Sequence, residues 1–282
     1  MLNFTEIELI LMISFGFSIA ILFAKRALNE LLPETFSFIY ILGASITMLI
    51  TYFTFNFNFS QINFHDFIIA LTGGLFGALG YLCGYIGLRK IHAGITNTIF
   101  NLQGPFIILL GLFFYANAID ANVIYSLIIS IIGLFMFSIK DIKYIKFNIW
   151  LLFITAAPIF WASMWIIFSF INTNTPIFYT LIMYFFADAY LFLISFLRKR
   201  INIRLNKHLY YSLCGGFISG LANSAYGIFI LSYGTTLTGL ITLLSVPITI
   251  ILAMVFLKEF YTVYEMLGIV LISIGLSIGV FL

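Results

Sequence analysis

Long apolar stretches, separated by short polar clusters, follow one another along the whole chain. The apolar runs are continuous rather than alternating, so the pattern favours helices over the strands of a membrane barrel. Ten runs are long enough, or nearly so, to cross a hydrocarbon core of about 30 Å as helices. We predict these helices at 6–25, 35–55, 66–88, 94–115, 122–139, 148–170, 176–197, 209–232, 236–257 and 262–281.

Composition gives the same answer. The chain is 63% hydrophobic and 8% charged, and its mean hydropathy is +1.15, whereas a soluble domain is about 25% charged. We therefore predict an all-α integral membrane protein with lipid around it. The net charge of +3 is small, and no basic patch is interleaved with exposed aromatics, so nucleic acid is not expected as a partner.

The chain contains one apolar pattern twice. Residues 71–138 match residues 213–280 without a gap, at a constant offset of 142. Two kinds of identity carry most weight, because Gly and Pro constrain the backbone: Gly73 falls on Gly215, and Pro105 falls on Pro247. Unbroken register over several apolar segments indicates a duplicated module.

Each predicted copy holds five helices, with the boundary near residue 145, so we divide the chain into 1–145 and 146–282. An odd number of helices turns the second copy upside down in the membrane. Inverted repeats are typical of secondary transporters. Duplication is also a general route to large membrane proteins, so the repeat alone leaves transport open.

The basic residues are one-sided. With ten spans, all 13 lie in or beside the connections of one side, and the opposite side, with both termini, has none. The positive-inside rule therefore places the termini outside the cytoplasm. The basic residues are Lys25, Arg26, Arg89, Lys90, Lys140, Lys143, Lys146, Arg198, Lys199, Arg200, Arg204, Lys207 and Lys258.

Small residues form stripes on two predicted helices. Segment 66–88 carries a glycine at every third or fourth position, and segment 209–232 repeats the spacing with Gly216, Gly220 and Asn223. Close helix packing explains such stripes, and a gate between helices that rock against each other is compatible with them. The candidate gating and hinge residues are Gly77, Gly80, Gly84, Pro105, Gly220 and Pro247.

Segment 94–115 is the most polar span, with Asn97, Thr98, Asn101 and Gln103 ahead of a proline. Lipid offers these amides no partner, so they must face a neighbouring helix or a wet cavity. We expect Pro105 to free the carbonyl of residue 101 and kink this helix, and Pro247 is its counterpart. Interhelical hydrogen bonding and cavity lining both remain open for the amides.

Aromatic and acidic residues add further candidates. Trp161 and Trp165 lie one turn apart and far from the membrane interface, and Asp188 is the one acid deep in a predicted span. A carboxyl group in lipid needs a partner or a proton, so Asp188 is a candidate coupling residue. A hydrogen bond to Tyr184 or to a neighbouring helix is the alternative. The full set predicted to bind substrate is Tyr81, Tyr85, Asn101, Gln103, Trp161, Trp165, Asp188, Asn223 and Tyr226.

Several segments resemble the drug/metabolite transporter superfamily, and within it the EamA-type ten-helix carriers. They are FGFSIAILFAKRALNELLPETFSF (15–38), IGLRKIHAGITNTIFNLQGPFIILL (86–110) and SYGTTLTGLITLLSVPITIILAMVFLKEFYTVYEMLGIVLISIGLSIG (232–279). The resemblance covers nearly the whole chain and implies transport. It departs at Asn117, where the acid matching Glu259 is expected, and in the termini, which members commonly keep in the cytoplasm.

These observations predict a secondary transporter that moves a small organic solute by alternating access, such as an amino acid, a metabolite or a drug-like compound. The proton is the candidate coupling ion. No catalytic, metal-binding or phosphate-binding motif is present, so neither an enzyme nor a cofactor is expected. We predict a multi-pass protein of a bacterial cytoplasmic membrane. A lipid-handling or membrane-scaffold protein without a soluble substrate is the alternative.

Overall fold

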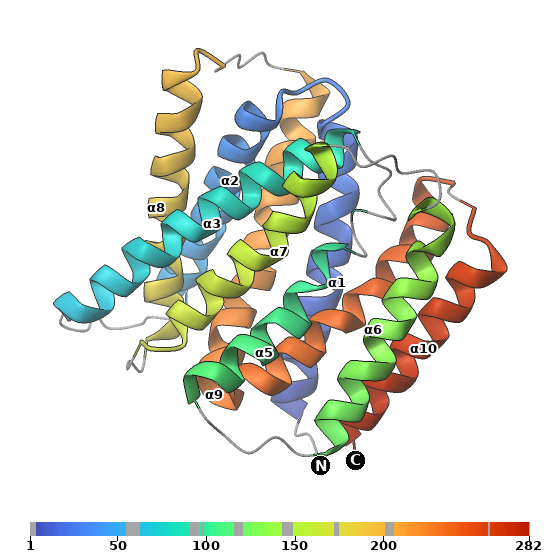
Figure 1. Ribbon diagram of the computed structural model, residues 1–282. Helices are drawn as coiled ribbons and strands as arrows, with labels where there is room; N and C mark the ends of the chain where they lie inside the picture. Colours follow the sequence, from blue (N-terminus) through green and yellow to red (C-terminus); the bar gives the residue numbers. More distant parts are fainter. Residues whose placement is uncertain are drawn as a thin grey trace.

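The computed structural model of the chain describes residues 4–54, 63–90, 96, 99–115, 121–142, 149–171, 175–200, 206–258 and 260–281. Every regular element in this part is a helix, as predicted (Figure 1). The helices are α1 (Phe4–Ala27), α2 (Pro33–Thr54), α3 (Phe64–Lys90), α5 (Gln103–Tyr115), α6 (Ala121–Ile142), α7 (Ile149–Phe168), α8 (Pro176–Leu197), α9 (Lys207–Phe256) and α10 (Val263–Phe281).

Five of the described helices, α1, α2, α3, α8 and α9, are long and apolar enough to cross a membrane. The apolar stretches described in α5, α6, α7 and α10 are shorter than those of these five helices. The helices overlap the segments expected from the sequence, while ten separate crossings remain a prediction.

Helix starts follow from local chemistry. Pro33 begins α2 and Pro176 begins α8, where the missing N–H of proline costs no intrahelical bond. Asn206 caps α9, because its side chain accepts hydrogen bonds from the backbone N–H groups of His208 and Leu209. These residues set where the three helices enter the bundle.

The predicted helices 209–232 and 236–257 form the two segments of α9. They meet at Gly234, whose φ of 80° and ψ of 174° interrupt the helix. A residue with a Cβ adopts positive φ only with strain, so glycine suits this junction. The second segment turns back toward the end of the bundle at which α9 began (Figure 1).

The helix is interrupted one turn ahead of Pro105, close to where the kink was expected. Asn101 and Leu102 form a turn, and α5 begins only at Gln103. Pro105 therefore lies in the first turn of α5, where a missing N–H breaks no helical bond. The carbonyl of Asn101 is not free, since it accepts a hydrogen bond of 3.2 Å from Gly104 N.

The two halves of the chain interlock. α3 packs against α7 and α8, and α9 packs against α1 and α2. These pairs are equivalent under the offset of 142, so the third helix of each half is held by the first two helices of the other half. α1 and α7, the first helices of the two halves, run in opposite directions (Figure 1).

The contact between α6 and α10 shows the same relationship at atomic detail. A Cβ added to Gly133 would lie 2.7 Å from Gly268 O, and one added to Gly275 would lie 2.8 Å from Ser126 O. Residues 126 and 268 differ by 142, as do residues 133 and 275. The contact therefore occurs twice with the two helices exchanged, as it does across a two-fold axis.

Candidate functional site

A cavity of about 100 Å³ lies between helices of both halves. Seven of the nine residues predicted to bind substrate line it, and the exceptions are Asp188 and Tyr226. Asn97 and Thr98, two further polar candidates, lie outside the described residues. The lining consists of Phe17, Ile21, Tyr40, Tyr81, Tyr85, Phe100, Asn101, Gln103, Trp161, Met164, Trp165, Ser219, Asn223, Thr242 and Ser245.

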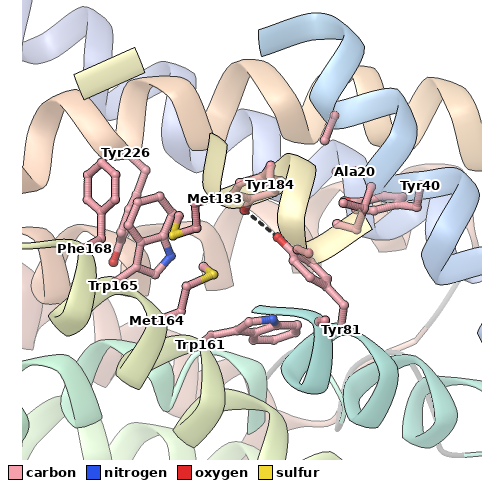
Figure 2. Close-up of a cluster of buried hydrophobic side chains, with 14 of the residues drawn as sticks. Ala20, Tyr40, Tyr81, Trp161, Met164, Trp165, Phe168, Met183, Tyr184 and Tyr226 are labelled. Carbon is pink, nitrogen blue, oxygen red and sulfur yellow. Dashed lines mark hydrogen bonds between the residues drawn. The ribbon is translucent and has the colours of Figure 1, made fainter. Parts of the chain in front are cut away.

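Aromatic rings from α3 and α7 form much of the cavity wall. Tyr81 and Tyr85 are stacked one turn apart on α3, with ring centroids 5.9 Å from each other. The ring of Trp161 meets Tyr81 edge to face at 5.3 Å and Phe100 at 4.8 Å. Figure 2 shows Trp161 beside Tyr81, whose hydroxyl forms a hydrogen bond of 2.7 Å with that of Tyr184.

Polar side chains join the halves across the cavity. The Ser245 hydroxyl, on α9, lies 2.8 Å from Asn101 Oδ1, just before α5, and 2.8 Å from Thr242 O, so its one proton is shared between these two acceptors. Asn223 Nδ2 donates to Ser219 Oγ at 2.9 Å and to Ser219 O at 2.8 Å, which fixes its amide against α9. These bonds hold two predicted amides at the cavity rather than toward lipid.

Tyr226 packs against a cavity-lining side chain on the side away from the cavity. It is fully buried, and its ring lies 4.5 Å from that of Trp165 and 6.0 Å from that of Phe17. Figure 2 shows Tyr226 and Phe168 close to the ring of Trp165. Tyr226 therefore positions Trp165, which lines the cavity, instead of lining it itself.

Comparison with known proteins agrees with this architecture. The model of the EamA-like transporter family matches residues 5–139 and again residues 148–281. The chain belongs to the EamA-like transporter family. It is thus a multi-pass membrane protein of the drug/metabolite transporter superfamily, which confirms the resemblance seen in the sequence.

No curated protein sequence matches the chain. Among solved structures, one described only as "Crystal structure of protein" has a TM-score of 0.73 and 13% sequence identity, with 95% of this chain and 96% of that chain covered. At this identity the likeness concerns the fold alone.

In this EamA-like transporter the glycines of α3 make room for side chains of α7. A Cβ at Gly77 would lie 2.7 Å from Met164 Sδ, and one at Gly80 would lie 2.6 Å from Trp161 Cδ1. Gly84 similarly accommodates the edges of Phe100 and Trp161. The stripe therefore lets bulky side chains stand against the α3 backbone, which places Trp161 at the cavity.

The other candidate hinge residues differ in their surroundings. A Cβ at Gly220 would lie 2.6 Å from Ala44 O, so α9 and α2 approach through their backbones. Pro247 lies within the second segment of α9, two residues after the cavity residue Ser245. A role for either residue in gating remains a prediction.

Asp188 lies outside the cavity, in the interior of α8. It is 9% exposed, and its Oδ1 has no hydrogen-bond partner among the described residues. The alternative partner considered for it, Tyr184, bonds to Tyr81 instead. Asp188 is thus one turn beyond the hydroxyl pair that reaches the cavity.

One end of the bundle, which we call the basic end, carries the C-terminal ends of α1, α3, α6 and α8 (Figure 1). Contacts between the halves gather there around His208, at the start of α9. Its Nδ1 lies 3.0 Å from Arg26 O, and its Nε2 lies 2.9 Å from Glu30 Oε1. Nearby, Ser195 Oγ donates to Glu34 O at 3.2 Å, which joins α8 to α2.

Sequence reasoning missed several cavity residues, among them Tyr40, Ser219 and Thr242. Ser219 carried a usable signal, since it lies one turn before Asn223 on the same face. Tyr40 carried a weaker signal, since it shares a face of α2 with the small or polar residues Ser37, Ala44 and Thr47.

Proposed function

We propose that this family member is a secondary carrier that moves a small organic solute by alternating access, with halves 1–145 and 146–282 rocking about the cavity. The observation that carries the proposal is the cavity itself, which side chains of both halves line. A site shared between two halves changes shape when the halves move. Such sites are typical of carriers built from inverted repeats.

The cavity chemistry is asymmetric although the scaffold is repeated. At the offset of 142, Asn101 corresponds to Leu243, and Tyr81 corresponds to Asn223. The amides therefore come from positions that are not equivalent in the two halves, and a solute meets different groups on its two sides. This asymmetry supports selection of one orientation of the solute, as expected of a binding site with a few fixed polar groups.

Protons are the coupling ion we propose, with Asp188 as the group that carries them. Its carboxyl is buried, and Oδ1 lacks a hydrogen bond within the described chain, so uptake of a proton would cost no existing bond at that atom. The Tyr184–Tyr81 pair begins one turn away and ends at the cavity. Movement of this pair is a physical route by which solute and proton could influence each other.

We propose that the basic end faces the cytoplasm and that both termini face the opposite side. The described basic residues near this end include Lys25, Arg89, Arg198 and Lys258, at or just after the ends of four helical segments. The positive-inside rule supports this orientation. In this orientation, the contacts around His208 lie at the cytoplasmic end of the protein.

Transport in proteoliposomes tests the proposal. Purified protein is first screened for solutes that raise its melting temperature, because a ligand of the native state stabilises it. The strongest solute is then offered in labelled form to proteoliposomes with and without a proton gradient. We expect saturable uptake that the gradient increases.

A matched pair of variants ties uptake to the cavity. Ser219→Trp fills the cavity, whereas Ser163→Trp adds the same bulk at a half-buried position of α7 outside the cavity. We expect the first to abolish uptake and the second to leave it intact. If the protein binds lipid or a partner protein but moves no solute, the proposal of a carrier is wrong. A lipid-handling or scaffold function then replaces it.

A further inference from the structure

We propose that the empty carrier opens its cavity less readily at the basic end than at the opposite end, because His208 and Arg26 bond the two halves together there. The inference rests on the carrier function proposed above, since it concerns the two conformations between which such a carrier alternates. It adds which conformation the empty protein prefers and which residues set that preference.

The repeated scaffold explains why a few residues can decide the preference. If the two halves were identical inverted repeats, exchanging their roles would turn one conformation into the other, and both would have the same free energy. A preference then comes only from contacts that one end of the bundle has and the other end lacks. Equivalent positions at the two ends are therefore the place to compare.

Two histidines occupy equivalent positions at the two ends. Asn63 Oδ1 accepts a hydrogen bond of 3.0 Å from His65 N at the start of α3, and Asn206 Oδ1 accepts one of 3.1 Å from His208 N at the start of α9. α3 and α9 contain the third helices of the two halves, and α9 begins at the basic end whereas α3 ends there (Figure 1). The shared cap therefore makes His65 the counterpart of His208 at the opposite end.

The two histidine side chains differ in what they contact. The side chain of His208 is 8% exposed and reaches the first half, where its Nδ1 donates to Arg26 O at 3.0 Å. Its Nε2 lies 2.9 Å from Glu30 Oε1, as an ion pair by distance rather than an aligned hydrogen bond. The side chain of His65 is 70% exposed, and its Nδ1 lies 3.1 Å from Asp66 Oδ1, its neighbour on α3. Of the two, only His208 bridges the halves.

Arg26 strengthens the junction at the basic end. Its Nη2 donates to Phe256 O at 3.2 Å, and its guanidinium lies 5.9 Å from the ring centroid of Tyr211. Arg26 thereby joins the end of α1 to both segments of α9. In the turn that follows α1, Leu28 and Leu31 are buried in the core although they lie at the end of the bundle. Opening this end would break the polar bonds and move the buried turn.

The opposite end also has a bond between the halves, because Asn63 N donates to Tyr179 Oη at 3.2 Å. Opening that end would break this bond, whereas opening the basic end would break the bonds of both His208 and Arg26. Each additional bond lowers the population of the conformation in which it is broken. The described contacts therefore favour a basic end that stays joined while the opposite end opens.

A thiol in the cavity measures opening at each end. Ser219→Cys, in a background without Cys83 and Cys214, is placed in proteoliposomes of known orientation without solute, and an impermeant thiol reagent is added to one side at a time. When opening equilibrates faster than labelling, the rate is proportional to the fraction of carriers open at that end. We expect slower labelling from the side that the basic end faces.

His208→Ala removes the bond to Arg26 O and should raise the labelling rate from the basic end by about three- to tenfold, as loss of one neutral hydrogen bond predicts. His65→Ala is the matched control at the equivalent position and should leave that rate unchanged. His208→Asn keeps an N–H donor and should label at a rate closer to that of the parent.

Arg26→Ala provides a second measurement, independent of whether His208→Ala folds. Arg26 is exposed, so the substitution removes its bond to Phe256 O with little change inside the bundle. We expect it to raise the labelling rate from the basic end in the same direction as His208→Ala, with the rate from the opposite end no higher than in the parent.

The outcomes separate this inference from the carrier function. Equal labelling rates from the two ends in the parent, or a basic-end rate that Arg26→Ala or folded His208→Ala leaves unchanged, would overturn the inference while alternating access stands. An equal rise in His65→Ala would also overturn it. Labelling from one side only in the parent and in every variant would instead contradict alternating access itself.

Discussion

Ser245 donates a 2.8 Å hydrogen bond to Asn101 Oδ1, and this bond joins α9 to the segment that precedes α5. The two residues come from different halves of the chain and both line the cavity. A bond in this place responds to any movement of one half against the other. If the halves rock as proposed, it contributes to the balance between the two conformations.

Replacing Ser245 by Ala tests that contribution. The change removes the hydroxyl and its hydrogen bond to Asn101 Oδ1, which should destabilise the present conformation by about 0.5–1.5 kcal/mol. We expect a lower melting temperature and an altered transport rate in proteoliposomes. Ser273→Ala removes a hydroxyl that bonds only within α10, so it controls for the loss of a helical serine. Equal behaviour of the two variants would contradict the role given to Ser245.

Gly234→Ala tests the junction within α9. Nothing lies within 4 Å of an added Cβ, so any effect comes from the backbone, whose φ is 80°. We expect a loss of about 1–2 kcal/mol in the free energy of unfolding, because alanine is strained at positive φ. Thermal or denaturant unfolding in detergent measures it, and an unchanged stability would argue against this backbone conformation.

The sequence predicted where the helices lie along the chain better than it predicted which face of each helix lines the cavity. Pro33, Pro176 and the Gly234 junction are local signals, and the helix boundaries at these points agree with the structure. The break before α5 lies one turn ahead of Pro105, close to the kink expected there, although a proline in this place suits the first turn of a new helix as well as a kink.

Cavity residues were predictable only where polarity marked them. Asn101 and Gln103 are costly in lipid, so their presence near the cavity could be foreseen. Asp188 was also marked by polarity, yet it lies outside the cavity. In a helix that is apolar all round, hydrophobic periodicity does not distinguish a cavity-facing residue from one that faces a neighbouring helix.

Asp188→Asn tests proton coupling. The amide keeps the shape of the side chain but cannot exchange a proton, so gradient-driven accumulation should be lost while solute binding and solute exchange persist. Asp66→Asn changes another buried aspartate, at the start of α3 beside His65, and serves as the control. Unchanged gradient-driven uptake by Asp188→Asn would remove Asp188 from the mechanism.

The orientation of the chain can be tested with one added cysteine. A cysteine appended at the C-terminus, with Cys83 and Cys214 replaced by serine, is exposed to a membrane-impermeant thiol reagent in intact cells. Because the basic residues gather at the opposite end, we expect labelling without breaching the membrane. Labelling that requires permeabilised cells would reverse the orientation.

The most direct test of the account is the accessibility of the cavity from each side of the membrane. Ser219→Cys, in the background without Cys83 and Cys214, places one thiol in the cavity. In proteoliposomes of known orientation, an impermeant thiol reagent is added to one side at a time, with and without a solute that raises the melting temperature. Alternating access about a shared cavity predicts labelling from both sides, slowed by the solute. Labelling from one side only, or at a rate that the solute leaves unchanged, would contradict it.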